Sequence, residues 1–141
     1  MIVLDTNVIS EPLKLDPSAT VLAWLDRQLP ESLYITAVNV AELLDGVGRL
    51  PKGRRRAALD DALRRRVLPL FAGRVLPFDL AAAEAFAHIS TRTRAAGLPI
   101  SLADAYIAAI AQARGFMVAS RDAAPFAAAG VRQIDPWAEA A

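Results

Sequence analysis

The chain has 141 residues, 55% of them hydrophobic, and its 16 basic and 15 acidic residues leave a formal net charge of +1. This length and apolar content predict one folded domain over residues 1–141 and exclude a disordered chain. The absence of cysteine excludes disulfides, thiolate metal sites and cysteine nucleophiles. The sequence shows neither a secretory signal nor an apolar run of about 18 to 20 residues, so we expect a soluble cytoplasmic protein.

Short apolar runs alternate with longer helical patterns along the chain. In order, we expect a strand at 2–4, a helix at 18–28, a strand at 33–36, helices at 38–47 and 54–70, a strand at 74–76, helices at 80–96 and 101–113, and strands at 116–119 and 131–134. Apolar strands that do not alternate and that are joined by helices predict a parallel sheet covered on both faces. Segment 51–71 lies between two strands and is expected to project as a helical hairpin.

Four acidic residues that are distant in the sequence fall next to one edge of this sheet. Asp5 directly follows the first strand and Asp122 follows the fourth, whereas Glu42 and Asp104 lie in the opening turns of helices. Strand ends and helix starts share the carboxyl edge of a parallel sheet, where such folds bind ligands. Each acid also has an ordinary alternative, because three of them could cap helices and Glu42 could be a solvated residue. Asp45 is an equally good candidate one helical turn after Glu42.

Carboxylates that share a pocket raise one another's pKa unless a cation relieves the repulsion. The candidate ligands are all oxygens, and the lone histidine, His88, lies in the middle of a helix, where a surface or packing role is expected. Hard oxygen ligands favour Mg²⁺ or Mn²⁺ over Zn²⁺. Such an ion can activate a water for in-line attack on phosphorus, whereas the sequence offers no convincing Ser/His or Cys/His nucleophile pair.

Several segments in a fixed order resemble one known family over essentially the whole chain. They are IVLDTNVISEP at 2–12, AEL at 41–43, LPFD at 76–79, ADAYIAA at 103–109, ASRD at 119–122 and DPW at 135–137. This pattern resembles the PIN-domain nucleases, and within them the VapC-type toxins of bacterial toxin–antitoxin pairs, particularly the FitB-like branch. The resemblance implies a single α/β domain with a five-stranded parallel sheet in the order 3-2-1-4-5, flanked by helices on both faces.

The resemblance also implies a Mg²⁺- or Mn²⁺-dependent endoribonuclease that hydrolyses RNA phosphodiester bonds and halts translation. By position, Asp5, Glu42, Asp104 and Asp122 match the family's acidic quartet. Asp5 and Asp104 are the first candidates for direct metal ligands, then Asp122, with Glu42 acting through water. Thr6 and Ser120 match small hydroxyl positions that brace those carboxylates or the water.

Partners are implied in the same way. Toxins of this kind dimerise and are silenced by a cognate VapB- or FitA-like antitoxin, whose C-terminal segment lies across the active site, often with an arginine among the acids. DNA is contacted through the antitoxin in the higher assembly. The alternative function is a catalytically weak regulatory partner that binds a DNA-binding antitoxin and strengthens repression, and the acidic pocket would serve either role.

Positive charge near the acids is expected to hold the RNA backbone. Arg121 adjoins Asp122 and could bind a phosphate, and a solvent-exposed turn is an equal alternative. The arginines of the predicted hairpin fall at i,i+4 spacing from acids, which favours a salt-bridged outer face. Aromatic residues that could stack on bases lie instead at helical-core spacing, namely Trp24, Phe86 and Tyr106.

Overall fold

The computed structural model describes residues 1–138, so residues 139–141 of the predicted domain lie outside the described residues. Within that range a parallel sheet has the strand order β3-β2-β1-β4-β5. Its strands are β1 (Ile2–Leu4), β2 (Leu33–Thr36), β3 (Val75–Leu76), β4 (Met117–Ala119) and β5 (Gln133–Ile134). The predicted sheet and its order are confirmed.

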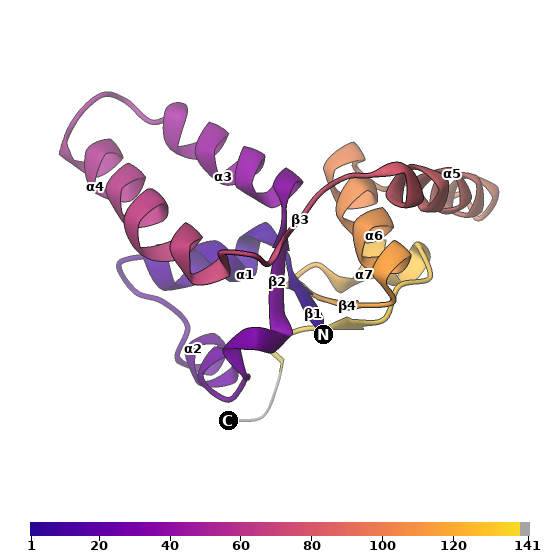
Figure 1. The fold of residues 1–141 in the computed structure, drawn as a ribbon, viewed down its shortest axis with the longest axis horizontal. Helices are drawn as coiled ribbons and strands as arrows, with labels where there is room; N and C mark the ends of the chain where they lie inside the picture. The colour runs from indigo at the N-terminus through magenta and orange to yellow at the C-terminus, as the bar shows by residue number, and fades with distance from the viewer. Residues whose placement is uncertain (139–141) are drawn as a thin grey trace.

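Helices form two arms on either side of this sheet (Figure 1). One arm is the hairpin of α3 (Ala37–Gly48) and α4 (Arg54–Ala62), and the other holds α5 (Leu80–Ala95) and α6 (Leu102–Arg114). The remaining helical elements are α1 (Thr6–Ser10), η1 (Glu11–Leu13), α2 (Ala19–Asp26), η2 (Pro30–Ser32), η3 (Leu63–Val67), η4 (Leu68–Phe71) and α7 (Ala123–Ala128). No helix in the described part of the chain is long and apolar enough to cross a membrane.

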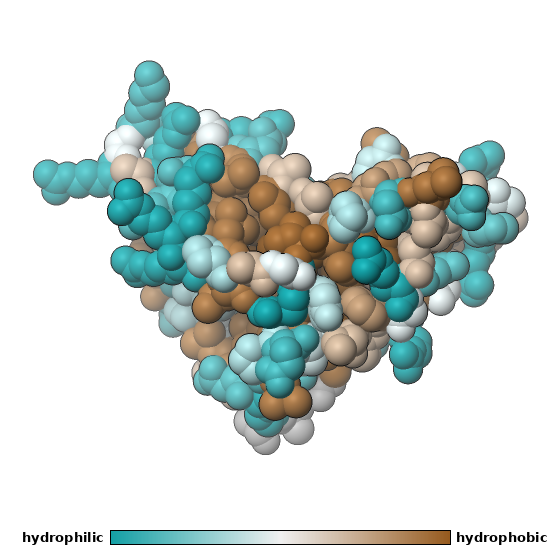
Figure 2. Space-filling view, in the orientation of Figure 1, coloured by the Kyte–Doolittle hydropathy of each residue, from teal (hydrophilic) through white to brown (hydrophobic). Residues whose placement is uncertain are grey.

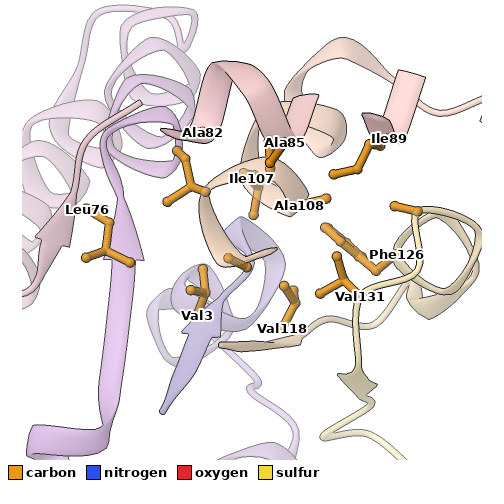
Figure 3. Packing of buried hydrophobic residues seen from close by; sticks show 14 residues of the cluster. Val3, Leu76, Ala82, Ala85, Ile89, Ile107, Ala108, Val118, Phe126 and Val131 are labelled. Atoms are coloured by element: carbon orange, nitrogen blue, oxygen red, sulfur yellow. The ribbon is translucent and has the colours of Figure 1, made fainter. Parts of the chain in front are cut away.

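Both faces of the sheet are buried, which explains why its strands read as continuous apolar runs. Val3 and the neighbouring Val118 belong to the core beneath α5, α6 and α7 (Figure 3). The next residues along the two strands, Leu4 and Ala119, belong to the opposite core with α1, α2 and α3. The sheet therefore separates two hydrophobic cores.

The predicted helix starts are set by side-chain caps. Ser18, Asp79 and Ser101 each accept a hydrogen bond from a backbone N–H in the first turn of their helices. At the other end of α6, Gly115 adopts a left-handed conformation with φ of 70°, which an L-residue with a Cβ rarely adopts. These caps fix the register of α5 and α6, and α6 carries Asp104 in its first turn.

The prediction of a single helix over 54–70 is wrong. The α-helical part ends at Ala62, a π-helical turn follows over η3, and η4 is a 3₁₀ turn that contains Pro69. Proline has no amide hydrogen, and its ring clashes with the carbonyl four residues earlier in a regular helix, so the chain changes its winding before this residue. The projecting hairpin is also made differently from the prediction, because α3 rather than a second helix within 51–71 is the partner of α4 (Figure 1).

Candidate functional site

Asp5 is held at the carboxyl end of β1 by hydrogen bonds on every side. Its amide donates to the Ala119 carbonyl of the neighbouring strand at 2.8 Å, and its side chain is buried, with 6% of the residue exposed. One carboxylate oxygen accepts from the Thr6 amide at 2.8 Å and the other accepts from the Ser120 hydroxyl at 2.7 Å. Asp5 does cap α1, as its ordinary alternative supposed, but the second bond ties the same carboxylate to the end of β4.

The electrostatics of Asp5 reflect this burial. Burial raises the pKa of the Asp5 carboxyl above its ordinary value, and hydrogen bonds from Ser120 and the Thr6 amide oppose that rise. Repulsion from the carboxylates of Asp104 and Glu42 raises the pKa of Asp5 further. Two acids that are distant from Asp5 in the sequence therefore lie near enough to raise its pKa.

Glu42 lies on α3, and its exposed side chain is bound by a neighbour from α1. The Thr6 hydroxyl donates to one carboxylate oxygen of Glu42 at 2.7 Å. The alternative candidate, Asp45, instead forms an exposed i,i+4 ion pair with Arg49 at 2.8 Å. Glu42 is therefore the acid of α3 that is tied to the edge of the sheet.

Asp104 and Asp122 complete the acidic group from two other elements. Burial raises the pKa of Asp104, hydrogen bonding from Ser101 lowers it, and repulsion from Asp122 raises it again. Asp122 precedes α7, but within the described residues its exposed side chain makes no capping hydrogen bond, so the capping alternative for it is wrong. Instead, its amide donates to the Ser120 hydroxyl at 3.1 Å, so Ser120 joins Asp122 to Asp5.

The predicted acids are thus linked in one electrostatic chain. Glu42 and Asp104 both act on Asp5, and Asp122 acts on Asp104. With the side chains as they stand, no three His, Cys, Asp or Glu residues across residues 1–138 are grouped closely enough to hold one ion. All of the candidate ligands are carboxylates, and the pKa values of two of them, Asp5 and Asp104, are raised. Such a set of oxygen ligands suits a hard divalent cation, which would draw the carboxylates together.

Arg121 extends from the turn between β4 and α7 and is exposed. Its guanidinium lies over the ring of Trp137 at 5.1 Å from the centroid, and its amide donates to the Asn7 side chain at 3.4 Å. Its positive charge also contributes to a lowered pKa at Glu11, behind the hydrogen bonds from Lys14 and Ser18. Arg121 is adjacent to Asp122 in the chain, and its charge remains accessible to solvent.

A groove adjoins Glu42 on the side of the α3–α4 hairpin. The groove has a volume of about 990 Å³, and Thr6 and Glu42 are among the residues that line it. Its floor is apolar, with Leu43, Val47 and Leu59 among the lining residues, and it is bordered by Lys14 and by arginines of the hairpin. Figure 2 shows apolar residues in the hollow of this face and hydrophilic residues along the projecting arm.

Other sequence expectations fall outside this group. The ion pairs Asp60–Arg64 and Asp61–Arg65 both form at 3.0 Å on the exposed side of the hairpin, as their spacing predicted. His88 is a surface residue. Trp24 is buried, and Phe86 and Tyr106 pack against each other with ring centroids 5.1 Å apart, so the interpretation of these aromatics as packing residues is confirmed.

One residue of the site escaped the sequence analysis. Asn39 is fully buried, and its side-chain amide donates to the Thr6 hydroxyl at 3.0 Å. The available signal was its spacing, because it lies three residues after Thr36, as in a capping box, and three residues before Glu42 on the same face of α3.

Comparisons with known proteins show the family to which this chain is similar. The PIN domain model matches residues 2–131. The chain is 53% identical over 137 residues to the VapC ribonuclease Y4jK of Sinorhizobium fredii, covering 97% of this chain and 98% of that protein. It is 47% identical over 137 residues to the toxin FitB of Neisseria gonorrhoeae, covering 97% of this chain and 99% of that protein.

A solved structure agrees with these relatives. The structure of FitAB bound to an IR36 DNA fragment contains a chain that is 44% identical and superimposes with a TM-score of 0.95, covering 100% of this chain and 99% of that one. The match to the family model spans the residues from β1 to the loop before β5, and therefore all of the acids described above. The chain belongs to the PIN-domain family.

Proposed function

We propose that this protein is an endoribonuclease that hydrolyses RNA phosphodiester bonds with a divalent cation and acts as the toxin of a type II toxin–antitoxin pair in the cytoplasm. The observation that carries the proposal is Asp5, a buried carboxylate with a raised pKa that is repelled by two other acids. A fold gains no stability from such repulsion, so the cluster is suited to binding a cation. The relatives named as a ribonuclease and as a toxin support the same activity.

Asp5 and Asp104 are the residues that would hold Mg²⁺ or Mn²⁺ directly, with Asp122 next and Glu42 through water. Bound there, the ion supplies an activated water and charge stabilisation for hydrolysis of a phosphodiester. Ser120 and the Thr6 amide keep the Asp5 carboxylate in one orientation, since each donates to a different oxygen. Each of these oxygens keeps a second lone pair for a ligand.

Substrate binding is assigned to Arg121. Its guanidinium lies on the face of Trp137, which limits its motion but leaves its N–H groups available. A phosphate beside Asp122 could therefore accept hydrogen bonds from Arg121 while the scissile bond lies over the acids. The exposed position of Arg121 agrees with a role in holding an RNA backbone.

The groove beside Glu42 supports an antitoxin as the partner. An amphipathic segment with an apolar face would cover the floor formed by Leu43, Val47 and Leu59, and acidic residues on it would meet the basic border. A basic residue at the end of that segment would reach the acids past Glu42. DNA would be contacted by the antitoxin. Exposed apolar residues at the start of α5, such as Phe78 and Leu80, are available for a homodimer contact.

The test is cleavage of total RNA by purified protein with Mg²⁺ or Mn²⁺ and with EDTA. Asp5→Asn and Asp104→Asn are expected to abolish cleavage. Asp45→Asn, which removes an acid from the same helix as Glu42 but outside the cluster, should retain it. Wild-type protein that folds and binds its antitoxin but shows no metal-dependent cleavage would contradict the proposal. That result would favour the regulatory alternative.

A further inference from the structure

A hydrogen-bond chain, buried at the start of α3, runs from there to the exposed side chain of Glu42. Asn39 is fully buried, and its side-chain oxygen accepts from both the amide and the hydroxyl of Thr36, each at 2.8 Å. The Asn39 side-chain nitrogen donates to the Thr6 hydroxyl at 3.0 Å, and that hydroxyl donates to Glu42 at 2.7 Å. Three elements, β2, α3 and α1, are joined by this chain.

The direction of every bond in this chain follows from its first member. The backbone N–H of Thr36 can only donate, so the atom of Asn39 that faces it must be the oxygen. The nitrogen of Asn39 must then face Thr6, and it occupies a lone pair of the Thr6 oxygen. The single proton of the Thr6 hydroxyl is therefore left for Glu42, which can accept it as a carboxylate.

We propose that Asn39 is a positioning residue, which directs the Thr6 hydroxyl toward Glu42 and so holds this exposed carboxylate at the acidic cluster. The inference rests on the proposed function insofar as Glu42 takes part in cation binding. A free glutamate side chain on a helix surface samples several rotamers, and ordering it costs conformational entropy. Asn39 and Thr6 are already held in place by the fold, so the hydrogen bond from Thr6 orders the Glu42 side chain before a cation binds. Less conformational entropy is then lost on binding.

The decisive variant is Asn39→Asp. It has nearly the same shape and can still accept from the Thr36 amide, but when ionised it cannot donate to Thr6. The Thr6 hydroxyl would then donate to the introduced carboxylate and release Glu42. Thr6→Val breaks the same chain at the next link. Thr36→Val is the matched control, because it weakens the cap of α3 while the Thr36 amide still holds Asn39 in place.

Two readouts on the free protein test the proposal. The first is the ¹³C resonance of the Glu42 carboxyl carbon, which is assigned by its loss in Glu42→Gln. Spectra are recorded at a pH where the resonance of the carboxyl introduced by Asn39→Asp shows that this group is ionised. The second is Mn²⁺ affinity by calorimetry. Asn39→Asp and Thr6→Val should each move the Glu42 resonance and weaken Mn²⁺ binding by about 10- to 100-fold, the usual effect of losing such a supporting partner. The double variant should be no worse than Thr6→Val alone, and Thr36→Val should leave both readouts unchanged.

Other outcomes overturn the inference. An unmoved Glu42 resonance in Asn39→Asp, or an equal movement in Thr36→Val, would show that Asn39 only caps α3. Additive losses in the double variant would show that Asn39 does not act through Thr6. Neither readout uses RNA, so protein that behaves as expected here but fails to cleave RNA contradicts the proposed function and leaves the role of Asn39 supported.

Discussion

Replacing Ser120 with alanine removes one hydroxyl that serves two acids. Ser120 is fully buried, donates to Asp5 at 2.7 Å and accepts from the Asp122 amide at 3.1 Å. A hydrogen bond to a charged group contributes about 1.5–3 kcal/mol to stability, so Ser120→Ala should lower the free energy of unfolding by about that amount. For a domain of this size, roughly 3–4 °C of melting temperature accompanies each kcal/mol, which gives a decrease of about 5–12 °C.

The loss of unfolding free energy in Ser120→Ala should depend on pH, and the direction of that dependence follows from the ionisation of Asp5. The Ser120 hydroxyl lowers the pKa of Asp5, which burial has raised above the ordinary value, so Ser120→Ala raises it further. Where Asp5 is protonated in both proteins the difference in stability is small, and it grows as pH rises through the raised pKa of Asp5. The assay is urea unfolding in EDTA at about pH 4 and about pH 7, within the range where carboxyl groups titrate.

Ser90→Ala is the control, because the Ser90 hydroxyl meets an exposed arginine, Arg94, at 2.9 Å and lies away from the acids. Because Ser90 is only half-buried and its partner is exposed, this change should alter the free energy of unfolding by less than about 0.5 kcal/mol at either pH. A loss for Ser120→Ala that is equally small, or that is the same at both pH values, would refute the assignment of Ser120 as the hydrogen-bond partner of an ionised Asp5.

Three further predictions concern the same cluster and one turn. The folded-state pKa of Asp5 is raised above its unfolded value, so this residue makes the stability of the wild type fall as pH rises. Asp5→Asn in EDTA should remove that contribution and flatten the dependence of the unfolding free energy on pH. Urea titrations that give the same pH dependence for both proteins would contradict this. Millimolar Mg²⁺ should raise the melting temperature of wild type and not of Asp5→Asn, and a shift in both would place the ion elsewhere. Gly130→Ala should cost about 1–3 kcal/mol of unfolding free energy, because φ is 82°, a conformation that residues with a Cβ rarely adopt. The added Cβ would also lie 2.8 Å from the end of the exposed Arg92 side chain, which would have to move. Gly48→Ala, with no described neighbour within 4 Å, should be neutral or stabilising.

Much of the fold could be read from the sequence because local signals and burial agree. The strands are apolar on both faces, and serine or aspartate side chains mark where α2, α5 and α6 begin. The winding change before Pro69 was missed because its apolar neighbours continue a helical pattern, although the proline itself was a signal that the regular helix ends or changes there. The spacing of apolar residues indicates which face of a helix is buried. It does not show whether a given turn is α-helical or π-helical.

Topology predicted that the four acids lie near one edge of the sheet, and the resemblance added Thr6 and Ser120 as hydroxyls that brace them. The role of Asn39 and the contact of Arg121 with Trp137 were not predicted. Asp5 and Asp122 follow strands and therefore had to reach one edge of the sheet. Asn39 carries no charge and resembles a capping residue, so its contact with Thr6 became visible only when β2 and β1 were placed side by side. The contact between Arg121 and Trp137 also joins separate elements, and neither residue lies in a pattern that indicates the pairing.

Paramagnetic broadening by Mn²⁺ in the NMR spectrum of the free protein tests most directly whether these separate acids form one site. We expect substoichiometric Mn²⁺ to broaden the amides around Asp5, Glu42, Asp104 and Asp122 together, and Asp5→Asn to abolish the broadening at all four positions. Broadening that spares any of these segments, or that persists in Asp5→Asn, would contradict a shared cation site.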